Sequence, residues 1–257
     1  MQSWRALVRF PQSNTALSSA LLTFTTLATL SLSAAALAAT RSKEFVFSIV
    51  TTLTILTSLT AGYLVEIGGW TISLSSAFYG GVYLGIDALT EFYRKVDAKR
   101  AVYYALVANG FLLASAVVFA TLAPAGLGYA SSVQDVFGFV PRVVVAALVA
   151  FAVSSRIEID LYAALRRRFS DVTGGLALRS NISTIVAQGV DSALFFGIAF
   201  YGLVDWPKLI ELALFGWAIR TVVALADTPL LYLVRVFKPA RKPTRRRPAA
   251  ARRAPGG

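Results

Sequence analysis

Seven apolar stretches, each about as long as a bilayer core is thick, account for most of this 257-residue chain. A membrane-spanning helix needs about 20 apolar residues. The connecting segments are too short for a soluble domain, and with 56% apolar and 15% charged residues the chain departs from globular averages. The sequence therefore predicts an all-α, polytopic membrane helix bundle. Its segments are expected at 15–38, 45–65, 72–92, 101–122, 137–155, 182–204 and 209–237.

The first apolar segment stands apart from the other six. Arg5 and Arg9 precede it and small residues end it, which is also the pattern of a secretory signal peptide. Its apolar run is longer than a usual signal core, which favours a retained helix or signal anchor. We therefore expect an N-terminal part at 1–44 with one extra helix at 15–38, a six-helix transporter domain at 45–237 and a basic tail at 238–257.

Lys and Arg in the loops predict the orientation, because short cytoplasmic loops carry an excess of them. Basic residues follow the third segment (94–100), the fifth (166–168) and the seventh, whereas the loops 66–70 and 124–134 have none. The C-terminus of this multi-pass protein is thus expected on the cytoplasmic side of the inner membrane. The tail holds eight of the 25 basic residues and no acid, which predicts a disordered, anionic-lipid-binding extension rather than a nucleic-acid-binding protein.

The absence of His and Cys restricts the chemistry that the chain can perform. It leaves no Ser-His-Asp or Cys-His nucleophile and no thiolate or imidazole metal site, so no cofactor or metal is expected. No Walker motif is present for ATP hydrolysis. A membrane enzyme that uses carboxylates alone remains as a minor alternative.

Polar residues inside the apolar segments are costly and mark candidate functional sites. At about 100° per residue, Ser180, Asn181, Thr184, Gln188 and Asp191 fall on one helical stripe. Small and amide side chains can simply join helices by hydrogen bonds. A carboxylate and two amides on one face favour a polar cavity instead, with Gln188 and Asp191 as the first substrate contacts.

Two acids, Asp87 and Glu91, lie one turn apart on the third segment, so their carboxylates share a face. Glu91 could alternatively pair with the basic residues that follow it. Arg179 fits either a functional role or snorkelling to headgroups, and Arg220 fits an ion pair with an aspartate of another helix. Tyr79 and Tyr83, on the same segment as the two acids, could cover a planar ligand or belong to the interfacial aromatic belt.

Three motifs carry a family resemblance. They are DALTEFY at 87–93, LRSNIST at 178–184 followed by QGVDS at 188–192, and Thr228-Pro229 with Tyr232. In this order and spacing, residues 49–237 resemble the queuosine precursor transporter family, six-helix membrane proteins that import 7-deazaguanine bases for tRNA modification. Arg220 lies where that family usually has Lys. The resemblance implies a substrate-binding set of Asp87, Glu91, Arg179, Asn181, Thr184, Gln188, Asp191 and Arg220.

The chemistry of a guanine-like base agrees with that set. A carboxylate accepts hydrogen bonds from its adjacent N–H donors, and an amide can meet its carbonyl oxygen. We therefore expect an importer of 7-cyano-7-deazaguanine or 7-aminomethyl-7-deazaguanine, with protonation of Asp87, Glu91 or Asp191 as the candidate coupling step. The alternatives are a substrate-binding membrane component of a vitamin or nucleobase system with a separate energising module, and a non-transporting structural membrane protein.

Overall fold

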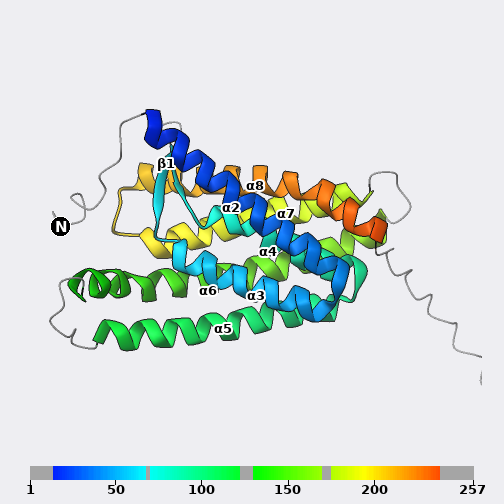
Figure 1. Ribbon diagram of the computed structural model, residues 1–257, viewed down its shortest axis with the longest axis horizontal. Helices are drawn as coiled ribbons and strands as arrows, with labels where there is room; N and C mark the ends of the chain where they lie inside the picture. The colour runs from blue at the N-terminus through cyan, green and yellow to red at the C-terminus, as the bar shows by residue number, and fades with distance from the viewer. Residues whose placement is uncertain (1–13, 68–69, 122–129, 170–174, 238–257) are drawn as a thin grey trace, which may run out of the picture.

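The computed structural model describes residues 14–67, 70–121, 130–169 and 175–237. These residues form a bundle of seven helices with one short antiparallel hairpin at one end (Figure 1), which confirms the predicted all-α bundle. Arg5, Arg9 and the basic tail lie outside the described residues. The elements are α2 (Asn14–Arg41), α3 (Lys43–Thr60), β1 (Leu64–Ile67), β2 (Trp70–Ser73), α4 (Ser76–Phe92), α5 (Lys95–Thr121), α6 (Ala130–Arg168), α7 (Gly175–Phe200) and α8 (Trp206–Phe237).

Successive helices run in alternate directions along a common axis (Figure 1). The α2–α3 and α4–α5 connections and the end of α8 therefore lie at one end of the bundle, which we call the basic end. The hairpin and the α7–α8 turn lie at the opposite end. Within the described residues, six helices have the length and hydropathy of membrane spans: Ser19–Arg41, Lys43–Thr60, Lys95–Thr121, Val140–Arg168, Gly175–Phe200 and Trp206–Phe237.

The segment predicted at 72–92 is a strand followed by a short helix, not one continuous helix. Its first residues form β2, which pairs with β1 in the register Leu64↔Ser73. The Ser73 hydroxyl donates to the carbonyl of Ala61 at 2.8 Å and contacts the Ser75 hydroxyl at 2.7 Å, which ties the hairpin to both neighbouring helices. Helix α4 then has 17 residues, all of them buried. Hydropathy alone could not separate this strand from the helix, because both are apolar.

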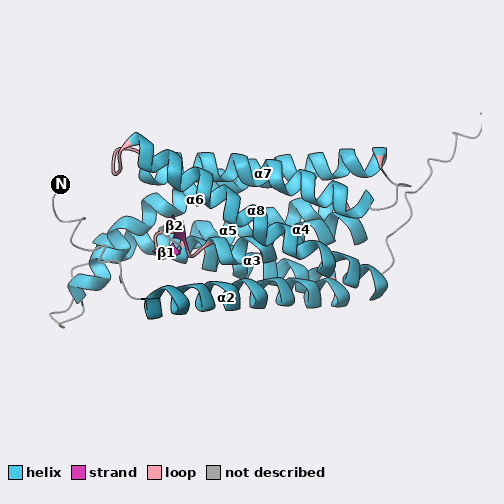
Figure 2. Ribbon diagram, turned by 90° about the horizontal axis from the view of Figure 1, so that it is seen from above, coloured by secondary structure: helices cyan, strands magenta, loops and turns pink. Residues whose placement is uncertain are grey.

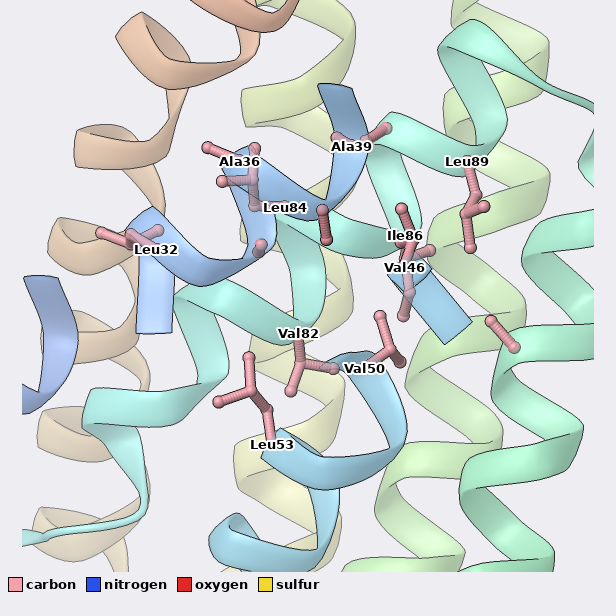
Figure 3. Close-up of a cluster of buried hydrophobic side chains, with 14 of the residues drawn as sticks. Leu32, Ala36, Ala39, Val46, Val50, Leu53, Val82, Leu84, Ile86 and Leu89 are labelled. Atoms are coloured by element: carbon pink, nitrogen blue, oxygen red, sulfur yellow. The ribbon is translucent and has the colours of Figure 1, made fainter. Parts of the chain in front are cut away.

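Helix α2 packs directly against α4. Ala35, Ala38 and Ala39 are fully buried, and the Ser31 hydroxyl donates to the carbonyl of Ala77 at 2.9 Å. A Cβ atom added at Gly81 would lie 2.6 Å from the carbonyl oxygen of Ser31, so the two backbones approach closely. Figure 3 shows side chains of α2, α3 and α4 filling one apolar cluster. These three helices form a tightly packed unit.

The opposite side of the bundle is formed by α6 and α7 (Figure 2). Helix α7 packs closely on α6 and α8, whereas α4 packs closely on α2, α3 and α8. The backbones of α4 and α7 do not pack closely on one another. The space between α4 and the α6–α7 pair is therefore spanned by side chains, and several of these are buried and polar.

Candidate functional site

A continuous set of buried polar side chains lies between α4, α6, α7 and α8. We call this set the polar column. Measured along α7 from Arg179 to Asp191, it extends about 18 Å at 1.5 Å per residue. Its members are Asp87 and Glu91 of α4, Ser154, Glu158 and Tyr162 of α6, Arg179, Ser180, Thr184, Gln188 and Asp191 of α7, and Arg220 of α8, all at most 4% exposed.

The end of the column nearer the basic end is closed around Glu91. Arg179 donates to Glu91 Oε1 at 2.6 Å, and the Tyr162 hydroxyl donates to Oε2 at 3.2 Å. The Nε atom of Arg166 lies 3.4 Å from the same Oε2. We call these four residues the Glu91 clamp. The partners of Glu91 thus come from α6 and α7 rather than from the basic residues that follow it, and Arg179, 4% exposed, does not snorkel to solvent.

The other end of the column is closed around Asp191. Arg220 donates to Asp191 Oδ2 at 2.6 Å, and the Ser154 hydroxyl donates to Oδ1 at 3.0 Å. The guanidinium of Arg220 also lies 3.9 Å above the ring of Tyr79 and donates to the Ser192 hydroxyl at 3.2 Å. We call Asp191, Arg220 and Ser154 the Asp191 clamp. The expected ion pair between Arg220 and an aspartate of another helix is confirmed.

Between the two clamps the polar groups are only partly satisfied. Ser180 donates to one carboxylate oxygen of Asp87, and Thr184 donates to Glu158 at 2.8 Å. The other oxygen of Asp87 has no hydrogen-bond partner in the described structure, and neither has the oxygen or the nitrogen of the Gln188 amide. A buried polar group without a partner costs about 1–3 kcal/mol. These open groups therefore indicate a place where a ligand or water binds.

An aromatic surface lies beside the column. The rings of Tyr79 and Tyr83 stack with their centroids 5.9 Å apart, and both pack on Ala187 of α7. The Tyr83 hydroxyl donates to the Ser154 hydroxyl at 3.1 Å, which links this surface to the Asp191 clamp. Tyr79 and Tyr83 are 3% and 0% exposed and lie in the interior of the bundle. They therefore do not belong to an interfacial aromatic belt, which was the alternative.

Seven of the eight predicted site residues meet in the column, and Asn181 does not. Its side-chain oxygen accepts a hydrogen bond from Thr228 at 2.7 Å, so it joins α7 to α8. Sequence reasoning missed three column residues of α6: Ser154, Glu158 and Tyr162. Their spacing of four residues is the signal that could have found them. The predicted segment ended at residue 155, whereas α6 continues to Arg168.

The acids of the column outnumber its deeply buried bases. Asp87, Glu91, Glu158 and Asp191 face Arg179 and Arg220, and each arginine is bound to one clamp carboxylate. Among the described residues no group of three or more His, Cys, Asp or Glu side chains is arranged to hold a metal ion. The arrangement is suited to recognising a polar ligand by hydrogen bonds and charge.

Comparisons with known proteins agree with this geometry. A family model described as "Putative vitamin uptake transporter" matches residues 73–234, a region that contains the whole polar column. The "Probable queuosine precursor transporter" of Bacillus subtilis (strain 168) is 30% identical over 180 residues, which cover 68% of this chain and 76% of that protein. No solved structure matches the chain significantly.

Proposed function

Since the chain belongs to the vitamin uptake transporter family, and so is a multi-pass membrane transporter rather than an enzyme, we propose that it imports a 7-deazaguanine precursor of queuosine. The substrate in this proposal is 7-cyano-7-deazaguanine or 7-aminomethyl-7-deazaguanine. The name of the Bacillus subtilis relative supports the substrate class. The chemistry of the polar column supports it independently.

The observation that carries the proposal is the open amide of Gln188. It is fully buried, and both its donor and its acceptor lack a partner among the described residues. A deazaguanine presents N–H donors beside a carbonyl acceptor, which an amide and a carboxyl oxygen can satisfy together. In our proposal the edge of the base binds Gln188 and the open oxygen of Asp87, and Tyr79 and Tyr83 cover its face.

The other predicted site residues either close the two ends of the site or hold its helices together. Glu91 with Arg179, and Asp191 with Arg220, close the two ends of the site and contact the base when a clamp opens. Thr184 positions the wall formed by α6, and Asn181 holds α7 against α8. Transport then requires the Glu91 clamp and the Asp191 clamp to open in turn, so that the base reaches one side at a time.

We propose that the basic end faces the cytoplasm of the cell and that the chain lies in the inner membrane. The described basic residues Arg41, Lys95 and Arg166 all lie at or near the basic end of the bundle. An excess of Lys and Arg in short loops marks the cytoplasmic side. The base would enter past the Asp191 clamp and leave past the Glu91 clamp.

Uptake of labelled base into cells that cannot synthesise it tests the proposal. The wild-type chain is expected to restore uptake of at least one of the two bases, with unlabelled deazaguanines as competitors. The double variant Gln188→Ala, Asp191→Ala is expected to lose it. Thr29→Ala is the control, because that exposed hydroxyl only donates to its own helix backbone.

Each outcome of this experiment has a separate meaning. Wild-type uptake by the double variant would overturn the assignment of the site. No uptake of either base by the wild-type chain would overturn the function. Uptake into liposomes that contain the purified chain alone separates a self-sufficient transporter from a binding component that needs an energising module.

A further inference from the structure

The three acids that the sequence offered for coupling, Asp87, Glu91 and Asp191, differ in whether the structure places a cation beside them. Glu91 is bound by Arg179 and Asp191 by Arg220, each at 2.6 Å. Asp87, 1% exposed, forms no ion pair in the described structure, and only the Ser180 hydroxyl donates to it. From this difference we propose that Asp87 is the proton-binding site of the transporter, and that one proton crosses with each base in the same direction.

The argument begins with the clamp acids, which are poor proton acceptors. Guanidinium groups stay charged in proteins. A proton on Glu91 or Asp191 would therefore leave a buried arginine without its anion. Breaking a buried pair in this way costs about 3–5 kcal/mol. Of the three acids that the sequence offered for coupling, this argument removes two.

For Asp87 the protonated form is favoured over the ionised form. An ionised carboxylate buried without a cation costs several kcal/mol, and a bound proton removes most of that cost. Its second oxygen has no partner in the described structure and is available to carry the proton. With both clamps closed, as here, we therefore assign the neutral carboxyl form to Asp87.

The groups around Asp87 agree with this assignment. Helix α4 contributes Glu91, α7 contributes Ser180 and Arg179, and α6 contributes Tyr162, whose ring and hydroxyl are fully buried. Arg179 is the cation among them, and it is bound to Glu91. The other helices around α4 contribute small and apolar residues to the same core cluster: Ala39 of α2, Val46 and Val50 of α3, Ala98 and Ala101 of α5, and Leu231 and Val234 of α8. The polar contacts of α2 and α8 with α4, from Ser31 and Arg220, are made to residues 76–79, at the other end of α4 from Asp87.

The same geometry allows the proton to leave Asp87 for water at the basic end. Glu91 lies one turn from Asp87 on α4, so opening the Glu91 clamp brings water to both acids. Arg179 directly precedes Ser180, whose hydroxyl donates to Asp87, so it also lies near this carboxylate. Once Glu91 is hydrated, Arg179 can pair with Asp87 instead, which favours its ionised form. The proton then leaves the Asp87 carboxyl for water at the basic end, and the next proton comes from water on the other side.

This inference rests on the proposed function, because coupling requires that the chain carries the base. The wild-type protein in liposomes tests it, with neutral 7-cyano-7-deazaguanine as substrate, a lumenal pH dye and the membrane potential held at zero. Adding the base outside is expected to acidify the lumen. A gradient of one pH unit, alkaline inside, is expected to raise accumulation of the base about tenfold, because one unit is worth about 1.4 kcal/mol.

The outcomes separate the two proposals. Base uptake without lumenal acidification, and without a response to the gradient, would overturn the proton site and leave the transport function intact. No base uptake under any gradient would overturn the function itself. These measurements use the wild-type chain, so they decide the question even if a variant fails to fold.

Infrared spectroscopy of the purified protein assigns the proton to a residue. A protonated carboxyl group has its own carbonyl stretching band, and Asp87→Asn is expected to lose the intensity of one such group at neutral pH. Asp160→Asn is the matched control on α6, because the Asp160 side chain is about half-exposed and paired with Lys95 at 2.8 Å. It is expected to leave the band unchanged. An unchanged band in Asp87→Asn would overturn the assignment.

Discussion

A guanidinium group that is buried away from water needs an anion and hydrogen-bond acceptors. Arg179 and Arg220 of the polar column each have an anionic partner that accepts a hydrogen bond. Arg220 is bound to Asp191, Ser192 and the face of Tyr79, and Arg179 is bound to Glu91. Each arginine joins helices that the sequence separates by many residues. The sequence predicts that a buried arginine needs a partner, but only the packing of α4, α7 and α8 decides which acid it meets.

The Asp191 clamp gives a prediction about stability. Asp191→Asn is expected to lower the free energy of unfolding by about 3–5 kcal/mol, because Arg220 is left buried without its anion. The double variant Asp191→Asn, Arg220→Gln removes both charges and is expected to recover most of that loss, but not the uptake of base. Thermal unfolding in detergent and uptake in cells measure the two effects. A double variant less stable than Asp191→Asn would contradict the pairing.

Gln188 gives a prediction that separates binding from folding. Gln188→Met keeps the side-chain length but removes the open amide, so uptake of the base is expected to fall at least tenfold while thermal stability is unchanged or higher, since a buried unsatisfied group is removed. Asn109→Ala is the contrasting variant, because that buried amide accepts from Ser58 at 2.6 Å and donates to Ala105 at 2.9 Å. It is expected to lose about 1–2 kcal/mol of stability. If Gln188→Met instead unfolds easily and binds normally, Gln188 is structural.

At the scale of elements, the hydropathy pattern predicted where the helices lie but not where each one ends. The predicted segment at 137–155 corresponds to α6, which continues to Arg168 through Arg156, Glu158 and Asp160. A hydropathy window ends where charges begin, yet Glu158 is buried and Asp160 faces the lysines of α5. The helix is amphipathic in that half, so one face continues the polar column. For this reason, the length of the apolar stretch did not predict the site residues that α6 contributes beyond residue 155.

Helix α4 is too short to reach the usual span length, and its packing shows why that is tolerated. Every one of its 17 residues is buried among the other elements, so it does not need to match the thickness of the bilayer on its own. Gly80, Gly81 and Gly85 let α8, α2 and α3 approach it closely. The element that carries Asp87 and Glu91 is thereby held rigidly on one side.

The contact between α4 and α2 can be tested with glycine substitutions. Gly81→Ala is expected to destabilise the protein by about 1–3 kcal/mol, because its Cβ would lie 2.6 Å from the Ser31 carbonyl oxygen. Gly110→Ala on α5 is the matched control, since a Cβ there meets nothing within 4 Å. Helix propensity predicts that it is neutral or slightly stabilising. Equal thermal unfolding temperatures for the two variants would contradict a close α2–α4 contact.

On the scale of the whole molecule, the packing divides into two parts that meet at the polar column. One part is the α2–α3–α4 unit with its apolar and small-residue contacts (Figure 3). The other is the α6–α7 pair, and both α5 and α8 pack on each of the two parts. The Glu91 clamp crosses this division directly. The Asp191 clamp, about 18 Å away along α7, is joined to α4 by Arg220, which lies 3.9 Å above the ring of Tyr79, and by the hydrogen bond from Tyr83 to Ser154. A relative movement of the two parts can therefore break one clamp while the other stays closed.

The chain has no cysteine, so a single introduced thiol reports this movement without background. Ala187→Cys places a thiol on α7 between the clamps, next to Tyr79 and Tyr83. A membrane-impermeant maleimide is expected to label it slowly from both sides in the otherwise wild-type chain. Adding Glu91→Gln loosens the Glu91 clamp and is expected to increase labelling several-fold from the basic end only. Adding Asp191→Asn is expected to increase it from the opposite end only.

The sidedness of this labelling is what distinguishes alternating clamps from general loosening. A bundle that merely comes apart admits the reagent from both ends in either variant, and a column that never opens admits it from neither. Saturating base is expected to protect the thiol in the wild-type background, because in our proposal the base covers Tyr79 and Tyr83, which pack against residue 187. Labelling from the same end in both variants would show that only one clamp acts as a gate, and the two-part movement would then be wrong.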